Sequence, residues 1–488
     1  MNIVDNVLFQ AIVQPKAPAL AAPGTGIGLV SYGRLAQIMR NIAHRLSRSG
    51  IGSGTIVAVS IEDPIFETAV LLALTRMGAV CISGFDEQVR NIVRLDAVVT
   101  DRELPPTGSE KIVGVDLYWT HGEQETWPPE CSSQIHPDDL CRITLTSGTT
   151  GRPKAVALSH ALLSARIARH ISVFGPQVMQ NVRMFSDLPV GTSLGFQFLI
   201  FTLWRGGLFV FPGKSFDDTI DAFHDFGVGC CLSSPGGLEV LLKWFERYPA
   251  LQSEIDVIMS AGDMLPKPLV DRVRSRICPH LVNVYSSTEA SITATAPAHL
   301  VEEVPGAVGL VNPGSVVEAV DESDAVLPAG TEGLLRVTSP FAVDRYFEDP
   351  AASAAVFRDG WFYPGEIGSV EADGVLRLTG RNDTLLNLGG DKISPEAIEA
   401  VIAAFPGVTE CAVFASANEF GNKEVVAVLV AREMMDEAKL KAHCSAHLAL
   451  PFVPAKFIRA VHLPRNPMGK VDRRRLPSLL EAGSRTVA

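Results

Sequence analysis

The residues with the clearest chemical potential form a run of small hydroxyl and glycine side chains that ends in a lysine. The run reads TSGTTGRPK over residues 146–154. Backbone N–H groups of such a loop can approach a phosphate closely, and the lysine adds a positive charge. The Walker pattern GxxxxGK[ST] is absent, so another kind of phosphate loop is indicated. Apolar runs at 141–145 and 155–158 predict flanking strands, and Ser159 is a suitable cap for a following helix.

A second candidate is Lys470, which follows Gly469 in a basic stretch near the end of the sequence. The stretch continues with arginines at positions 473–475. Such a charge run is usually a solvated surface, so Lys470 taken alone would be read as a surface residue. Only its combination with other segments gives it a chemical role.

The elements that must position these residues follow from hydrophobic spacing. Helical spacing over 32–49 and 66–77 alternates with short apolar runs at 56–61 and 79–82. The same alternation of strand and helix patterns recurs later, with strands expected at 227–232, 257–260 and 281–285 and a helix at 236–248. This alternation predicts an α/β fold in which helices cover the faces of a parallel sheet.

The pattern changes after about residue 305. Strands expected at 333–338 and 375–379, with many turns, indicate a smaller, twisted β region. A new unit then holds helices at 395–404 and 436–447 and strands at 410–415 and 424–430. We therefore predict a large N-terminal α/β domain over residues 1–381, which includes the β subdomain, and a small α+β C-terminal domain over 384–488.

Composition excludes several classes of function. The net charge of −12 is spread along 488 residues and does not suit a nucleic-acid surface. The eight cysteines form no CxxC pair and do not indicate a disulfide framework. Residues 1–8 lack a signal-peptide pattern, and the apolar stretch 194–211 is too interrupted to span a bilayer. We expect a cytoplasmic protein with no membrane span and no nucleic-acid partner.

Five segments, in this order, resemble motifs of the adenylate-forming superfamily, which includes acyl-CoA synthetases, peptide-synthetase adenylation domains and luciferases. TSGTTGRPK resembles its triphosphate loop, and YSSTE at 285–289 resembles its YGxTE segment. GRND at 380–383 resembles the hinge, and GDKISPEAIE at 390–399 the stretch after it. NPMGK at 466–470 resembles the C-terminal NxxGK pattern. The resemblance extends over most of the chain, and the five ordered motifs are far more specific than any one alone.

The resemblance implies two reactions at one site. A carboxylic acid attacks the α-phosphorus of ATP to give an acyl-AMP and pyrophosphate, and the acyl group then passes to a thiol. Both reactants of the first step are anions, so cations and oriented dipoles must offset their repulsion. Lys470 would supply this cation, assisted by Thr288 and Glu289, and Glu289 would also hold Mg²⁺.

The resemblance assigns further roles by position. Nucleotide binding falls to Thr146, Ser147, Gly148, Thr149, Thr150, Gly151, Lys154, Asn283, Tyr285, Glu366 and Arg381. Asp383 would be the hinge about which a C-terminal lid rotates between the two steps and withdraws Lys470. Gly389 and Gly390 would then line the path of the thiol.

Some positions depart from the family pattern. Glu366 stands where the family usually has an aspartate on the ribose hydroxyls, and Pro364 lacks an N–H donor. Ser286 replaces a usual glycine, and Asn387 replaces a frequent lysine. These departures motivate an alternative, a relative that binds nucleotide but is catalytically impaired.

The acyl pocket is less readable. Thr192 stands about where many acyl-CoA and aryl-CoA synthetases carry a histidine. Phe196, Gly262 and Ser287 are further candidate walls, although each could equally be ordinary core. The aspartate that grips an α-amine in amino-acid-activating members is absent from residues 190–198, and an unpaired buried ammonium is costly. We expect an acid without an α-amino group.

The favoured function is an acyl-CoA synthetase that uses ATP, Mg²⁺ and CoA. Residues 387–393 look more like those of CoA ligases than those of peptide-synthetase domains. The alternative acceptor is the phosphopantetheine thiol of a separate acyl carrier protein. The identity of the acid stays open, as does the choice between a monomer and a homodimer.

Overall fold

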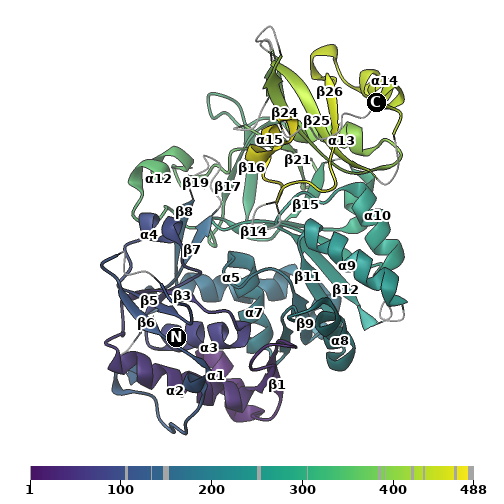
Figure 1. Ribbon diagram of the computed structural model, residues 1–488. Coiled ribbons are helices and arrows are strands. Elements are labelled where there is room, and N and C mark those ends of the chain that lie inside the picture. The colour runs from purple at the N-terminus through teal and green to yellow at the C-terminus, as the bar shows by residue number, and fades with distance from the viewer. Residues whose placement is uncertain are drawn as a thin grey trace.

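The computed structural model describes residues 2–104, 108–132, 135–146, 153–249, 254–304, 306–382, 386–388, 391–418, 423–431, 435–465 and 470–481. Two large sheets with their helices form the lower and middle parts of the molecule in Figure 1, and the C-terminal unit lies above them. The mixed α/β architecture is the one that the sequence predicts.

The first sheet carries the strands on either side of the phosphate loop. Its order is β6-β5-β3-β4-β7-β8, and its neighbours are parallel except for the antiparallel pair β7 and β8. The strands are β3 (Ile56–Ser60), β4 (Val80–Ser83), β5 (Ala97–Thr100), β6 (Lys111–Gly114), β7 (Leu140–Thr146) and β8 (Lys154–Ser159). The helices of this segment are α2 (Tyr32–Arg48), α3 (Pro64–Arg76) and α4 (Glu87–Ile92). The hydroxyl of Ser31 caps α2 by accepting the N–H of Arg34 at 3.3 Å.

The second sheet has 15 strands. They are β1 (Pro18–Ala21), β2 (Leu29–Ser31), β9 (Arg183–Ser186), β10 (Leu208–Val210), β11 (Cys230–Ser233), β12 (Val257–Ala261), β13 (Leu281–Ser287), β14 (Ser291–Pro297), β15 (Ala307–Val311), β16 (Val316–Val320), β17 (Gly333–Thr338), β18 (Phe357–Arg358), β19 (Trp361–Phe362), β20 (Glu366–Val370) and β21 (Val375–Arg381). Strands β9 to β13 are parallel, and β14, β15, β21 and β20 follow in antiparallel order.

The smaller β region expected after residue 305 is therefore continuous with the large sheet. The link is β14, which turns back beside β13 and pairs with β15 through its other edge. Further helices belong to the same part of the fold as the second sheet. They are α1 (Asp5–Val13), α5 (His160–Val173), α6 (Pro176–Gln180), α7 (Ser193–Trp204), α8 (Phe216–Phe226), α9 (Pro235–Arg247), α10 (Lys267–Arg276), α11 (Ala298–Glu303) and α12 (Pro350–Val356).

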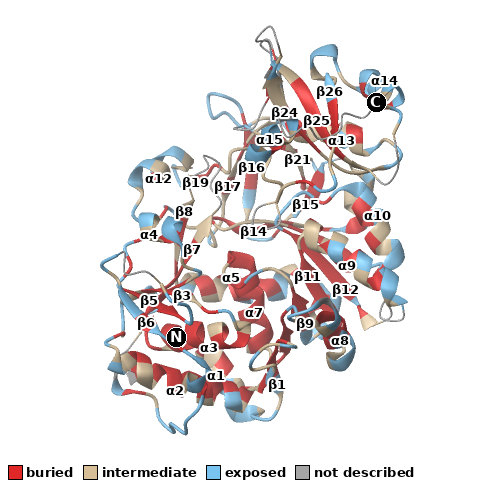
Figure 2. Ribbon diagram, viewed as in Figure 1, coloured by how far each residue is buried: buried red, intermediate tan, exposed pale blue. Residues whose placement is uncertain are grey.

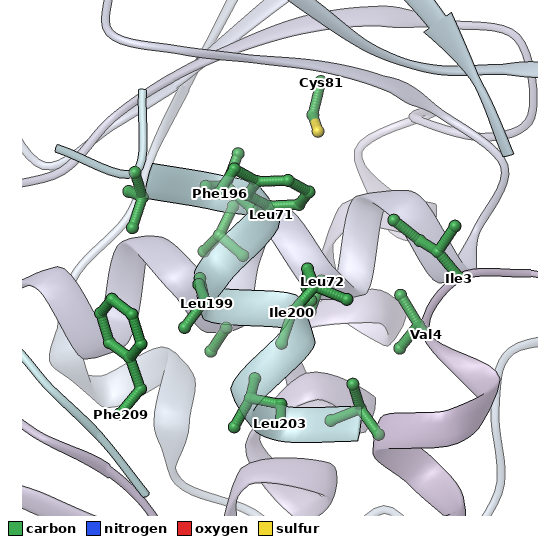
Figure 3. Close-up of a cluster of buried hydrophobic side chains, with 14 of the residues drawn as sticks. Ile3, Val4, Leu71, Leu72, Cys81, Phe196, Leu199, Ile200, Leu203 and Phe209 are labelled. Carbon is green, nitrogen blue, oxygen red and sulfur yellow. The ribbon is translucent and has the colours of Figure 1, made fainter. Parts of the chain in front are cut away.

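Helix α7 lies at the centre of the main core. Its side chains are apolar on all sides, as expected of a fully buried helix, and Phe196, Leu199 and Leu203 are at most 1% exposed. Figure 3 shows these side chains together with Leu71 and Leu72 of α3 and with Phe209 of β10. Figure 2 shows the buried residues concentrated on α5, α7 and the central strands. The interrupted apolar stretch is thus core, as predicted. Within the described ranges, no helix has both the length and the apolar character needed to cross a bilayer.

The C-terminal unit has its own small core. Its elements are β22 (Leu386–Leu388), β23 (Asp391–Ile393), α13 (Pro395–Ala403), β24 (Val408–Ala417), β25 (Lys423–Ala431), α14 (Glu437–His447), β26 (Lys456–Arg459) and α15 (Leu476–Glu481). Strands β24, β25 and β26 form a three-stranded sheet, and α13 and α14 pack against each other. This α+β arrangement agrees with the sequence prediction.

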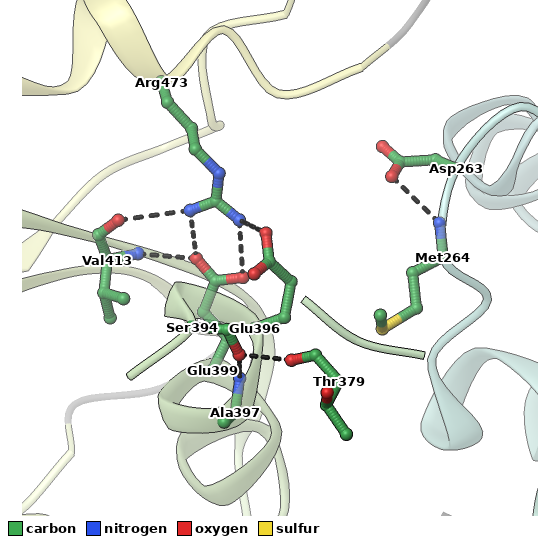
Figure 4. Close-up of polar contacts among 9 residues, drawn as sticks. All are labelled: Asp263, Met264, Thr379, Ser394, Glu396, Ala397, Glu399, Val413 and Arg473. Atoms are coloured by element: carbon green, nitrogen blue, oxygen red, sulfur yellow. Dashed lines mark hydrogen bonds and ion pairs between the residues drawn. The ribbon is translucent and has the colours of Figure 1, made fainter. Parts of the chain in front are cut away.

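A half-buried arginine, Arg473, fixes the segment that carries Lys470 (Figure 4). Nη2 of Arg473 donates to Glu396 and to Glu399 of α13 at 2.9 Å each, and Nη1 donates to the carbonyl of Val413 at 3.1 Å. Such charge-assisted bonds are the stronger kind. They tie the chain three residues after Lys470 to both α13 and β24.

Candidate active site

The phosphate loop closes a β-hairpin. Thr146 and Lys154 are Cα partners across β7 and β8, so both ends of the loop lie at the same point of the first sheet. The loop residues Ser147, Gly148, Thr149, Thr150 and Gly151 lie outside the described residues. Nζ of Lys154 pairs with Asp349 at 3.1 Å, and Asp349 in turn caps α12. Lys154 therefore stands at the mouth of the loop, beside one carboxylate.

The turn between β13 and β14 carries Thr288 and Glu289. Glu289 is 7% exposed, and its Oε1 accepts the hydroxyl proton of Tyr346 at 2.9 Å. Burial raises the pKa of the Glu289 carboxyl, whereas the hydrogen bond from Tyr346 and the charges of Arg166 and Arg381 lower it. An acidic group in such surroundings favours a bound cation, which would replace the proton.

Strands β20 and β21 place Glu366 opposite Arg381, as Cα partners. Nη1 of Arg381 lies 3.9 Å from Oε1 of Glu366, and its Nη2 donates to the carbonyl of Pro364 at 3.1 Å. The hydroxyl of Tyr285 donates to the same carboxylate of Glu366. Because Arg381 also lowers the pKa of Glu289, its charge reaches both carboxyl groups.

Lys470 belongs to this group of charges. Burial raises the pKa of Glu366, and the hydrogen bond from Tyr285 and the charges of Arg381 and Lys470 oppose this rise. The positive charge of Lys470, in the C-terminal unit, thus acts on Glu366, a residue 104 positions earlier in the sequence. One carboxylate is faced by cations from both parts of the molecule.

The remaining predicted nucleotide ligand, Asn283, is 5% exposed and donates from Nδ2 to the carbonyl of Val308 at 2.8 Å. Its side chain is thereby engaged with β15. The predicted adenine contact of Asn283 stays a prediction, as does the stacking role of Tyr285. Asp383, Gly389 and Gly390 fall outside the described residues.

The candidate acyl walls come from three elements. Thr192 caps α7, because its hydroxyl accepts the N–H of Gly195 at 3.0 Å. Ser287 stabilises the β13–β14 turn by accepting the N–H of Ala290 at 2.9 Å. Gly262 is exposed at the end of β12, with open space around the position that a Cβ would take.

Phe196 has a different setting from the other three walls. It is 1% exposed, and the guanidinium carbon of the buried Arg142 lies 3.9 Å from its ring centre. The ring is therefore packed in the core, behind the turn that carries Thr192. Its role as a pocket wall stays a prediction.

Three residues of the site were not predicted from the sequence: Tyr346, Asp349 and Arg166. The first two contact Glu289 and Lys154 from a segment without a recognisable motif. Arg166 did leave a signal, because it lies on the apolar stripe of α5 with Leu163 and His170. An arginine on a buried stripe indicates a fixed partner inside the protein.

The donor set suits one kind of metal site. Within the ranges that the structure describes, no group of three or more His, Cys, Asp or Glu side chains could hold a metal ion. Mg²⁺, however, is usually bound by one or two carboxylates together with substrate phosphates and water. Glu289 with the neighbouring Thr288 hydroxyl fits that requirement, whereas the site could not form a cage made only of protein ligands.

Comparisons with known proteins show what this chain is similar to. The family described as AMP-binding enzyme matches residues 9–347, and its C-terminal domain matches residues 397–470. 4-Chlorobenzoate–CoA ligase of Arthrobacter sp is 28% identical, covering 98% of this chain and 95% of the relative. Indoleacetate–CoA ligase of Aromatoleum aromaticum is 26% identical, covering 96% of each. The ATP-bound structure of MatB from Rhodopseudomonas palustris has a TM-score of 0.82 at 25% identity, covering 98% of this chain and 99% of that one.

Proposed function

This chain belongs to the family of AMP-binding enzymes and is an AMP-forming acid–thiol ligase. We propose that it makes acyl-CoA from a carboxylic acid. The proposed site is the one around Glu289, Glu366, Arg381 and Lys470. The observation that supports the proposal is that the positive charges of Arg381, 3.9 Å from Glu366, and of Lys470, from the C-terminal unit, both act on the Glu366 carboxyl. It explains how two negatively charged reactants can come together.

The first step joins the acid to the α-phosphorus of ATP, and pyrophosphate leaves. Lys470 neutralises charge that grows on the attacking carboxylate and the α-phosphate oxygens. Arg381 supports the same region from β21, and Lys154 serves the outer phosphates by exchanging Asp349 for the nucleotide. Groups already in place cost little reorganisation, and removing one such group typically slows a reaction by about 10²–10³-fold.

Glu366 is the proposed ribose ligand. Its carboxylate is held by Tyr285 and Arg381, so its extra methylene is already fixed before the nucleotide arrives. An ionised carboxylate can accept both ribose hydroxyls. This arrangement argues against impaired activity, because Glu366 keeps a carboxylate within the site despite Pro364.

Mg²⁺ is the proposed metal, and Glu289 would hold it together with phosphate oxygens of the nucleotide. Bound there it would supply positive charge that offsets the leaving pyrophosphate. The Tyr346 hydroxyl orients the Glu289 carboxylate through Oε1. Thr288 adds a hydroxyl beside the phosphates.

The second step requires another arrangement at the same centre. We propose that the unit after Asp383, residues 384–488, turns about this residue as a lid on the domain formed by residues 1–381. The turn removes Lys470 and lets a thiol enter along Gly389 and Gly390. The contacts of Arg473 with Glu396 and Glu399 lie within the unit that would move, so they support its motion as one body.

The acid is proposed to be aromatic and to lack an α-amino group. The relatives named above act on 4-chlorobenzoate and indoleacetate, which share these features. CoA is the proposed acceptor for the same reason, and the phosphopantetheine of a carrier protein is the competing one. We also propose a cytoplasmic location, since all eight cysteines are free, as in a reducing compartment.

A pyrophosphate-release screen over aromatic, aliphatic and dicarboxylic acids tests the function. The best acid, incubated with ATP, Mg²⁺ and either CoA or a carrier protein, should give the CoA thioester by mass. Its α-amino analogue serves as the matched control and should be a poor substrate. Nucleotide binding without pyrophosphate release for any acid would contradict the proposal, and thioester on the carrier alone would correct the acceptor.

A further inference from the structure

Helix α5 contains an arginine that is fully buried, at 0% exposure. Arg166 lies on the inner stripe of the helix that follows the phosphate-loop hairpin. Burying a guanidinium costs free energy unless its N–H groups find acceptors. The hydrogen-bond partners of Arg166 therefore indicate its role. The side chain lies behind the proposed metal site and reaches no solvent.

Two of its three hydrogen bonds go to the turn that carries Thr288 and Glu289, and the third goes to Phe341. Nη1 donates to the carbonyl of Thr288 and Nη2 to the carbonyl of Glu289, both at 2.9 Å. Nε donates to the carbonyl of Phe341 at 2.8 Å. The carbonyl of Glu289 also accepts the N–H of Val343 at 2.9 Å. One guanidinium therefore joins the metal-site turn to the segment that supplies Tyr346.

The shape of the group matters here. Successive carbonyls of an extended strand point to opposite sides, but those of Thr288 and Glu289 both meet the same planar fork. Their direction fixes the conformation of the peptide between them and thus the direction of the two side chains. Lysine carries its charge as a point and cannot reproduce this fork.

We infer that Arg166 is a positioning residue, which aims the Glu289 carboxylate and the Thr288 hydroxyl at metal-bound ATP through the two backbone carbonyls. The inference rests on the proposed function of this site. Arg166 itself touches neither metal nor nucleotide.

The same helix supplies a matched control. Arg169, one turn later, is 5% exposed, and its Nη2 donates to the carbonyl of Pro313 at 3.0 Å and to the hydroxyl of Ser315 at 2.9 Å. Its guanidinium carbon lies 4.4 Å from the centre of the Phe341 ring. Arg169 is thus a buried arginine of the same helix that does not bond to the metal-site turn.

The experiment compares R166K with R169K. It measures binding of Mn²⁺ to the enzyme–ATP complex by electron paramagnetic resonance, the Mg²⁺ concentration that half-saturates adenylate formation, the KM of the acid, and the unfolding temperature. Supporting side chains of metal ligands typically change metal affinity by about 10–100-fold. We expect that loss for both metals in R166K, with the KM of the acid nearly unchanged. R169K should lower the unfolding temperature to a similar extent and leave both metal titrations at the wild-type values.

Wild-type metal titrations in R166K, or equal shifts in R169K, would overturn the inference. If R166K shows no cooperative unfolding, R166Q takes its place, since its amide keeps donors without a buried charge. Loss of folding in both variants would assign Arg166 a structural role instead. The Mn²⁺ titration needs no acid substrate, so it separates failure of this inference from failure of the proposed function, which would appear as a wild-type enzyme inactive on every acid.

Discussion

Replacing Glu366 with glutamine tests the ribose contact. A hydrogen bond to a charged group contributes about 1.5–3 kcal/mol, against about 0.5–1.5 kcal/mol for a neutral pair. Each 1.36 kcal/mol is a factor of ten. The wild-type enzyme should therefore use 2′-deoxy-ATP about 10–150-fold less well than ATP. In E366Q this penalty should fall to about 2–12-fold, because the charge that strengthened the bond is gone.

The assay is acid-dependent pyrophosphate exchange with both nucleotides, reported as kcat/KM. Y285F is the control, because it removes the hydroxyl that now bonds to Glu366 and leaves the carboxylate in place. Its discrimination between the two nucleotides should stay within the wild-type range. Equal use of ATP and 2′-deoxy-ATP by the wild-type enzyme, or the same penalty in E366Q, would refute the role of Glu366.

Three further predictions concern stability and lid placement. Burial raises the pKa of Glu67 from 4.5 to about 7, so its stabilising contribution is complete below about pH 4.5 and is lost as pH rises through about 7. E67Q should therefore gain unfolding temperature over wild type from about pH 5 to about pH 8, and a constant difference would contradict this. Leu199→Ala should cost about 2–5 kcal/mol in denaturant unfolding, against less than about 0.5 kcal/mol for the exposed Val240→Ala, and equal costs would contradict the core assignment. A Cβ on Gly380 would lie 2.1 Å from the Cβ of Ser394, which is a clash. Gly380→Ala should therefore displace the C-terminal unit and slow pyrophosphate exchange by up to about 10²-fold. A wild-type rate of exchange in this variant would contradict the predicted clash.

Local elements were predictable where periodicity and caps agree. The helix expected at 32–49 is α2 (Tyr32–Arg48), and the strand expected at 257–260 is β12 (Val257–Ala261). Ser159, expected to cap the helix after the phosphate loop, accepts the N–H of Leu162 at 3.2 Å. Such features depend on residues close in sequence, so their signal is visible without a fold.

Pairing between distant segments was not predictable in the same way. The β region after residue 305 was expected as a smaller subdomain of the N-terminal domain, but its pairing with the large sheet through β14 was not foreseen. The contact between Tyr285 and Glu366 joins residues 81 positions apart, and no spacing pattern in the sequence predicts it. Motif resemblance brought these two residues into one hypothesis, whereas Tyr346 needed the fold to become visible.

The proposed mechanism requires Lys470 to act in one step only. The direct measurement compares Lys470→Ala with wild type in two assays: formation of acyl-AMP from ATP and acid, and thioester formation from CoA and supplied acyl-AMP. Loss of one oriented charged donor predicts about 10²–10³-fold slower adenylation, while thioester formation keeps much of its rate. Equal loss in both assays, or undiminished adenylation, would contradict the claim that this lysine meets Arg381 at Glu366 to bring two anions together.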